Sequence, residues 1–125
     1  MKKLITYTLP RPFNKYNIPI AIQSNYLKDY AKINDYEFSL PVTEIKTKNI
    51  YIELKKIIKK KPTNIGMVSI FILPIQNSKE LKSLVKSVTK KTKFHFALEK
   101  LVMSKEELLN WSAEYTKYKR VIKSF

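Results

Sequence analysis

The 125-residue chain contains no cysteine, one glycine and one histidine. Without cysteine the chain can form neither a disulfide framework nor a thiolate nucleophile, and a lone histidine does not favour a structural zinc site. A single glycine, Gly66, cannot build the glycine-rich loops with which Rossmann folds and P-loop proteins hold phosphate groups. We therefore predict neither a metal site nor a bound cofactor.

Long apolar runs are also absent. No stretch approaches the roughly 18 to 20 apolar residues of a membrane-spanning helix, and the apolar segment that follows Lys2 and Lys3 is short and ends at Pro10. We expect a cytoplasmic protein without a membrane span. The length and a hydrophobic content of 44% fit one domain, residues 1–125, with a single core.

Acidic residues are few. The chain has 10 Asp and Glu against 25 Lys and Arg, which gives a formal net charge of +15. Such a balance favours an anionic partner. Only Arg11 and Arg120 are arginine, however, whereas recognition of phosphates and bases usually favours the arginine fork, and a bias toward Lys, Ile and Asn is typical of any protein from an AT-rich genome. The charge therefore leaves sugar phosphates, nucleotides and nucleic acid open.

The apolar pattern alternates between strand-like runs and helical stripes. Prolines bound several of these segments, and Ser104 with Glu107 forms a capping box that predicts the start of the last helix. We predict strands at 3–8, 36–40, 66–73 and 94–98, and helices at 19–33, 50–58, 78–88 and 104–122. In this reading Gly66 begins the third strand, and Ser69 lies in its middle.

This alternation predicts an α/β three-layer sandwich with a four-stranded parallel sheet, since parallel strands need helical crossovers. A strand order 2-1-3-4, as in flavodoxin-like and resolvase-like folds, is the leading topology. The last helix carries an apolar stripe, which predicts core packing or a homo-oligomer contact over 104–122, with stacking on single-stranded nucleic acid as the alternative. The stripe consists of Leu108, Trp111, Tyr115, Tyr118 and Ile122.

Polar residues follow the carboxyl ends of the predicted strands, where ligands bind in open α/β sheets. They are Arg11, Thr43, Glu44, Ser69 and Glu99. Arg11, held between two prolines, suits a carboxylate or phosphate clamp, or else a structural ion pair. Glu44 and Glu99 could act as a general acid and base, although a lone glutamate is often a helix cap or a lysine partner. Thr43 and Ser69 are candidate ligand-binding residues.

Three further residues complete the predicted site. His95 is the only side chain whose usual pKa lies near neutrality, so it is a candidate catalytic group or else a hydrogen-bonded core histidine. Gln23 lies on the first turns of the first helix, where it could bind a ligand or remain exposed. Tyr7, on the first strand, is assigned to ligand binding with Arg11.

The early Tyr7 and Arg11, Gln23 on the first helix and the long last helix resemble the catalytic domain of serine recombinases of the resolvase and invertase type. In that family a serine lies two residues beyond the first arginine, and further arginines follow the third strand. Here Phe13 stands at that position, and residues 73–76 include no arginine. The resemblance implies the recombinase architecture without its nucleophile.

A second resemblance covers nearly the whole chain. It is carried by residues 7–13, 18–19, 29–30, 43–44, 69–74 and 95–99, together with Gln23 and Leu54. These segments are similar to the small "sporadic carbohydrate cluster" proteins of bacterial surface-polysaccharide and lipopolysaccharide biosynthesis loci. Where that family suggests a cysteine just after Asp29 and Tyr30, this chain has Ala31.

From these resemblances we expect a protein of surface-carbohydrate biosynthesis that binds or modifies a sugar phosphate or a nucleotide sugar at the carboxyl edge of the sheet. Arg11 and nearby lysines would hold the anion, and Glu44 or Glu99 would do acid and base work with support from His95. Two alternatives are a non-catalytic nucleic-acid-binding or regulatory module with a recombinase-like fold, and an interaction subunit that docks a partner enzyme through its last helix.

Overall fold

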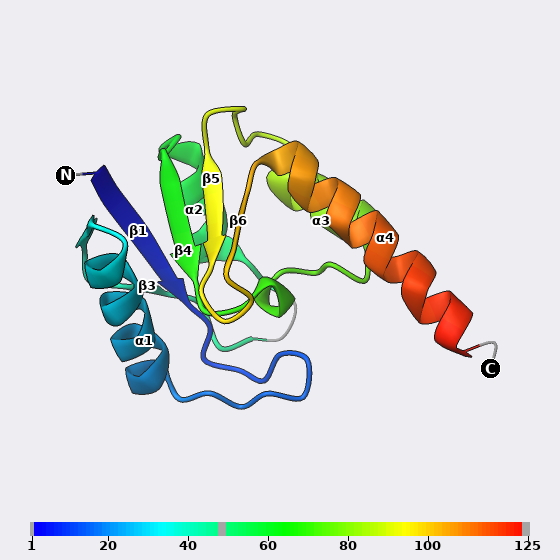
Figure 1. Cartoon of the computed structure of the whole chain (residues 1–125), viewed down its shortest axis with the longest axis horizontal. Helices are drawn as coiled ribbons and strands as arrows, with labels where there is room; N and C mark the ends of the chain where they lie inside the picture. Colours follow the sequence, from blue (N-terminus) through cyan, green and yellow to red (C-terminus); the bar gives the residue numbers. More distant parts are fainter. Residues whose placement is uncertain (1, 48–49, 124–125) are drawn as a thin grey trace.

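A computed structural model describes residues 2–47 and 50–123 of the chain (Figure 1). The strands are β1 (Lys2–Thr8), β2 (Tyr36–Phe38), β3 (Val42–Thr43), β4 (Asn64–Met67), β5 (Lys93–Phe96) and β6 (Leu101–Met103). The helices are α1 (Ile20–Ile33), α2 (Ile52–Lys59), α3 (Ser78–Val85) and α4 (Lys105–Lys123), with a 3-10 turn η1 at Ile70–Ile72. The elements therefore alternate as the sequence predicts, with two short strands added.

The strand order is β2-β1-β4-β5-β6, and β3 pairs with β1 beyond β2. The first four members are parallel and confirm the predicted order 2-1-3-4, while β6 extends the sheet antiparallel to β5. The sequence analysis did not anticipate β6, because three residues give too short an alternation to identify a strand. The α/β class, the resolvase-like order and the long terminal helix are all present.

The helices cover the two faces of the sheet unequally (Figure 1). On one face the larger core packs Ile65, Met67 and Phe94 of the sheet against Leu54 of α2 and Leu84 of α3. On the other face α1 lies alone, and a small cluster joins its Leu27 to Val68 and Ala97. α4 packs beside α3 and β6, and its outer half projects from the body.

The apolar spacing predicts that helix α1 buries Ile22, Tyr26, Leu27, Tyr30 and Ile33. Its buried residues are instead Gln23, Leu27 and Ala31, spaced four apart, whereas Ile22 and Ile33 are 56% and 79% exposed. Only Leu27 of the predicted stripe is fully buried, because that stripe followed the apolar residues alone. The sheet face under α1 carries buried polar groups, among them His95 and Asn64, and a buried glutamine is compatible with them.

The third predicted strand, 66–73, is also corrected. Strand β4 ends at Met67, and the apolar residues that follow form η1, whose N-terminus is capped because the Phe71 amide donates to Ser69 Oγ at 3.2 Å. Gly66 lies within β4, between Thr6 and His95 of the neighbouring strands. A Cβ at Gly66 would lie 3.0 Å from a methyl group of Leu4, so a larger residue at this strand position would require the Leu4 side chain to shift.

The start of α4 confirms the predicted capping box. The Glu107 amide donates to Ser104 Oγ at 3.3 Å, and the Ser104 amide donates to Glu107 Oε1 at 3.0 Å. These hydrogen bonds lower the pKa of Glu107. Within residues 2–47 and 50–123, no helix is long and apolar enough to cross a membrane.

Candidate functional site

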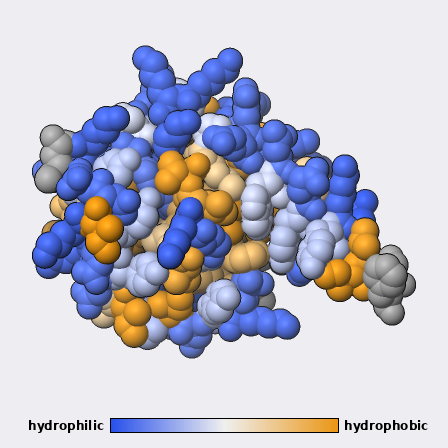
Figure 2. All heavy atoms as spheres, viewed as in Figure 1, coloured by the Kyte–Doolittle hydropathy of each residue, from blue (hydrophilic) through white to orange (hydrophobic). Residues whose placement is uncertain are grey.

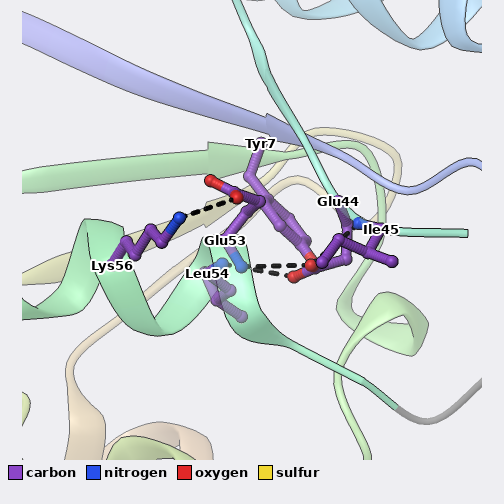
Figure 3. A network of polar contacts seen from close by, with 6 residues as sticks. All are labelled: Tyr7, Glu44, Ile45, Glu53, Leu54 and Lys56. Carbon is purple, nitrogen blue, oxygen red and sulfur yellow. Dashed lines mark hydrogen bonds and ion pairs between the residues drawn. The ribbon is translucent and has the colours of Figure 1, made fainter. Parts of the chain in front are cut away.

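Glu44 anchors the start of helix α2 (Figure 3). Its side chain is 3% exposed and accepts four hydrogen bonds, from the Tyr7 hydroxyl at 2.8 Å and from the backbone amides of Ile45, Glu53 and Leu54 at 2.9 to 3.2 Å. Glu53 and Leu54 belong to the first turn of α2, whose amides have no partner within the helix. A carboxylate at this helix end is favoured by the helix dipole as well.

The same contacts set the protonation of both side chains. Burial alone would raise the pKa of Glu44, but the hydrogen bonds from Glu53, Ile45, Tyr7 and Leu54 outweigh burial and lower it. Burial raises the pKa of the Tyr7 phenol well above its usual range, and the hydrogen bond to Glu44 raises it further. At neutral pH the pair is therefore a neutral phenol that donates to a carboxylate.

The Arg11 side chain contacts the segment that leads into α2. Its Nη1 donates to the carbonyl oxygens of Ile45 and Thr47 at 3.1 and 3.0 Å, and its Nη2 donates to Ile50 O at 3.1 Å. The guanidinium carbon lies 5.1 Å from the centre of the Tyr51 ring, in cation–π range. Arg11 thus binds carbonyl oxygens and an aromatic face, and neither of the alternatives considered from the sequence included this arrangement.

Gln23 and Thr43 connect the carboxyl end of β1 to neighbouring segments. The buried Gln23 amide accepts from Leu9 N at 3.1 Å and donates to Leu9 O and Ile18 O, both at 2.8 Å. It thereby holds both ends of the loop between β1 and α1. Thr43 Oγ1 lies 3.0 Å from Thr8 Oγ1, beside the parallel pairing of β3 with β1.

Ser69 and Glu99 form a second hydrogen-bonded connection, here called a tie, at the carboxyl edge of the sheet. Ser69 Oγ donates to Glu99 Oε2 at 2.8 Å, and the Ile70 amide donates to Glu99 Oε1 at 2.7 Å. Glu99 lies in the turn between β5 and β6, so this tie fastens that turn to η1. Arg11 and Glu44 hold the segment before α2, whereas Glu99 holds the turn after β4.

His95 lies under α1 and makes contacts separate from both ties. It is 2% exposed, and its two ring nitrogens lie 2.7 Å from the Tyr30 hydroxyl and 2.9 Å from Asn64 Oδ1. Because Asn64 Oδ1 can only accept, Nε2 carries the proton and Nδ1 accepts from Tyr30. Burial lowers the pKa of His95 to about 4, so the ring is neutral at pH 7.

Sequence reasoning did not single out Tyr30 or Asn64, although both bind the only histidine. A signal was present for Asn64, because an asparagine that opens a buried strand needs a hydrogen-bond partner inside the protein. Among the residues that the structure describes, no group of three or more His, Asp or Glu side chains is placed to hold a metal ion.

Comparison with known proteins identifies the architecture. No protein-family model matches the sequence, and no curated protein matches it. Among solved structures, the chain is similar to the N-terminal catalytic domain of TP901-1 integrase, with a TM-score of 0.68 and 19% sequence identity over 98% of this chain and 99% of that chain. At this identity the match shows a shared fold, and it agrees with the recombinase-like architecture that the sequence predicts.

Proposed function

We propose that the chain is a non-catalytic nucleic-acid-binding module built on a recombinase-like fold. The domain that it resembles in structure belongs to an integrase. In the serine recombinases that the sequence resembles, the nucleophilic serine lies at the position of Phe13. A phenylalanine side chain cannot act as a nucleophile, and Phe13 is only 6% exposed. The retained fold would then serve binding without strand cleavage.

The observation that carries this proposal is a lysine-rich surface on helices α2 and α3. The two helices are neighbours, because Ile52 and Lys55 of α2 line one groove with Ser83 and Leu84 of α3. The exposed lysines of these helices and of the residue that follows α3, here called the basic face, are Lys55, Lys56, Lys59, Lys79, Lys82 and Lys86. Lys56 alone of these six pairs with a carboxylate within the described residues, that of Glu53 at 3.2 Å. The remaining ammonium groups are available to phosphates.

Salt-dependent binding tests the basic face. The parent protein should bind a DNA duplex with an affinity that falls linearly with the logarithm of salt concentration. The double substitution K82E/K86E on α3 should weaken binding and lower this slope by about 2, since each lost phosphate contact contributes about 1. Fluorescence anisotropy at several salt concentrations measures both quantities.

The matched control is K28E/K32E, which changes the charge equally on exposed lysines of α1, in the opposite layer. This variant should retain most of the slope. A flat salt response of the parent would contradict nucleic-acid binding. Equal effects of the two variants would contradict the basic face as its site.

We also propose a homo-oligomer through the outer half of α4. This half projects from the body (Figure 1), and apolar atoms gather at its end (Figure 2). Tyr118, Val121 and Ile122 are 63%, 54% and 52% exposed there, a spacing that places them along one side of the helix. A second α4 would cover this side.

Light scattering tests the oligomer. The parent should show a mass above that of the 14.8 kDa chain that rises with concentration, and V121E/I122E should return it to a monomer because charges would enter the contact. L40E is the control, since Leu40 is 88% exposed but follows β2, at the edge of the sheet opposite to β6, beside which α4 packs. A monomeric parent at every concentration, or dissociation by L40E as well, would contradict the proposal.

A second candidate function is the binding of a phosphorylated or nucleotide-linked sugar in surface-carbohydrate biosynthesis. Its support is the sequence resemblance to the sporadic carbohydrate cluster proteins. The segments that carry this resemblance include Arg11, Gln23, Glu44, Ser69 and Glu99, whose described contacts are bonds within the chain. We propose that these residues stabilise the fold and that any sugar ligand binds elsewhere.

A further inference from the structure

A cavity lined by several lysines lies at the edge of the sheet opposite to the predicted site. Its volume is about 510 Å³, and its walls come from the beginning of β1, the segment between β2 and β3, the end of α2 and the start of β4. The sheet has a gap beside the cavity. On this side of β1, β2 pairs only with Lys2–Leu4 and β3 only with Tyr7–Thr8, so Ile5 has no partner strand there. The volume falls in the range of small-molecule sites.

The lining combines cations with an apolar surface. The lining lysines are Lys2, Lys3 and Lys60, and no carboxylate is among the lining residues. None of the three lysines makes an ion pair with another described residue. Ile5, Val42, Ile57 and Pro62 form the apolar part, and Ser39 and Thr63 add hydroxyl groups.

This composition selects a class of ligand. Lys3 on β1 and Lys60 after α2 contribute ammonium groups from two sides of the cavity, whereas Lys2, the preceding strand residue, lies on the other face of β1. Two such groups suit a phosphate or diphosphate, because each provides a compact charge with several hydrogen-bond donors. The apolar part suits the uncharged body to which the phosphate is attached. A long nucleic acid would instead need an open track of cations, which the basic face of α2 and α3 offers.

We propose that this cavity binds a phosphorylated small molecule, whose phosphate is held by Lys3 and Lys60 and whose body rests on Ile5, Val42 and Ile57. This site gives the sugar-phosphate candidate a location, and in that respect it rests on the second proposed function. It does not depend on the nucleic-acid proposal, because the two sites use different lysines.

Calorimetry with glucose 1-phosphate, uridine diphosphate glucose, inorganic phosphate and glucose tests the site. The two phosphorylated sugars should bind, and glucose should not. The variant K3Q/K60Q should weaken the binding at least about tenfold, because it removes two charged hydrogen-bond donors. The control K59Q/K61Q makes the same change in charge at two exposed lysines that flank Lys60 and do not line the cavity, and it should change the affinity by less than about twofold.

The remaining outcomes separate the two claims. Binding that survives K3Q/K60Q unchanged would overturn the site while leaving the sugar-phosphate function in place. Equal weakening by K59Q/K61Q would overturn the site in favour of diffuse attraction to a basic protein. No binding of any phosphorylated probe by the parent would overturn the site together with the second candidate function. A variant V42W, which narrows the cavity without changing charge, should weaken sugar phosphates more than inorganic phosphate.

Discussion

Replacing Glu44 with alanine is expected to lower the free energy of unfolding by at least about 3 kcal/mol. The substitution leaves the Tyr7 hydroxyl and the amides of Ile45, Glu53 and Leu54 without their acceptor. All four donors meet a carboxylate that is 3% exposed, so water replaces it poorly. Because small domains have only about 5 to 15 kcal/mol of stability, this loss would be a large part of the total.

Urea denaturation followed by the fluorescence of Trp111, the only tryptophan, measures this loss. E53A is the matched control, since Glu53 lies beside the same helix end but makes a side-chain ion pair only with Lys56 at the surface (Figure 3). It should cost less than about 1 kcal/mol. A cost for E44A that equals that of E53A would show that Glu44 is not a structural anchor.

The second large effect is a loss of stability in mild acid that depends on His95. In the folded protein the pKa of His95 is lowered to about 4 by burial, whereas in the unfolded chain it returns to its usual value near 6.5. Between these values the unfolded state binds more protons than the folded state. The contribution of His95 is therefore complete above pH 6.5 and is lost as the pH falls toward 4, by up to about 1.4 kcal/mol for each pH unit.

Denaturation curves between pH 7 and pH 5 test this dependence, because the protonation of Glu44 affects the free energy of unfolding only at lower pH. The pKa of Glu44 is lowered on folding, so its contribution is present above its unfolded value and is lost as the pH falls below about 4.5. The variant H95Q should flatten the curve in the upper window. Since the chain has one histidine, its ring resonances in NMR spectra are unambiguous, and a titration near pH 6.5 would contradict the prediction.

The sequence allowed the fold class and strand order to be predicted because most of the predicted strands end in a clear signal. Proline or a polar turn residue follows the strands, and Ser104 with Glu107 marks the last helix by a pattern that has one physical meaning. The segment 66–73 was misjudged, because a buried strand and a buried 3-10 turn are equally apolar. Only the pairing with β5, which ends at Phe96 beside Met67, decides between the two.

The predicted site was harder to interpret, because a polar residue at a strand end can bind either a ligand or the chain itself. Gln23 bonds to the backbone of Leu9, which is 14 residues away, and Arg11 bonds to carbonyl oxygens that are 34 to 39 residues away. Glu44 accepts from the Tyr7 hydroxyl, which is 37 residues away. No local pattern reveals such pairings. The spacing of Gln23, Leu27 and Ala31 did contain a signal, since it places the glutamine on the buried side of α1.

The central claim is that the polar residues at the carboxyl edge of the sheet stabilise the fold, while ligands bind at lysines elsewhere. NMR spectra of the backbone amides, recorded during titration with a DNA duplex and separately with glucose 1-phosphate, test it most directly. The account predicts that the amides of Leu9, Ile45 and Ile70, which donate to Gln23, Glu44 and Glu99, keep their resonances. Shifts should be confined to the basic face and to the cavity of Lys3 and Lys60. Saturating shifts of those three amides with either ligand would contradict the claim.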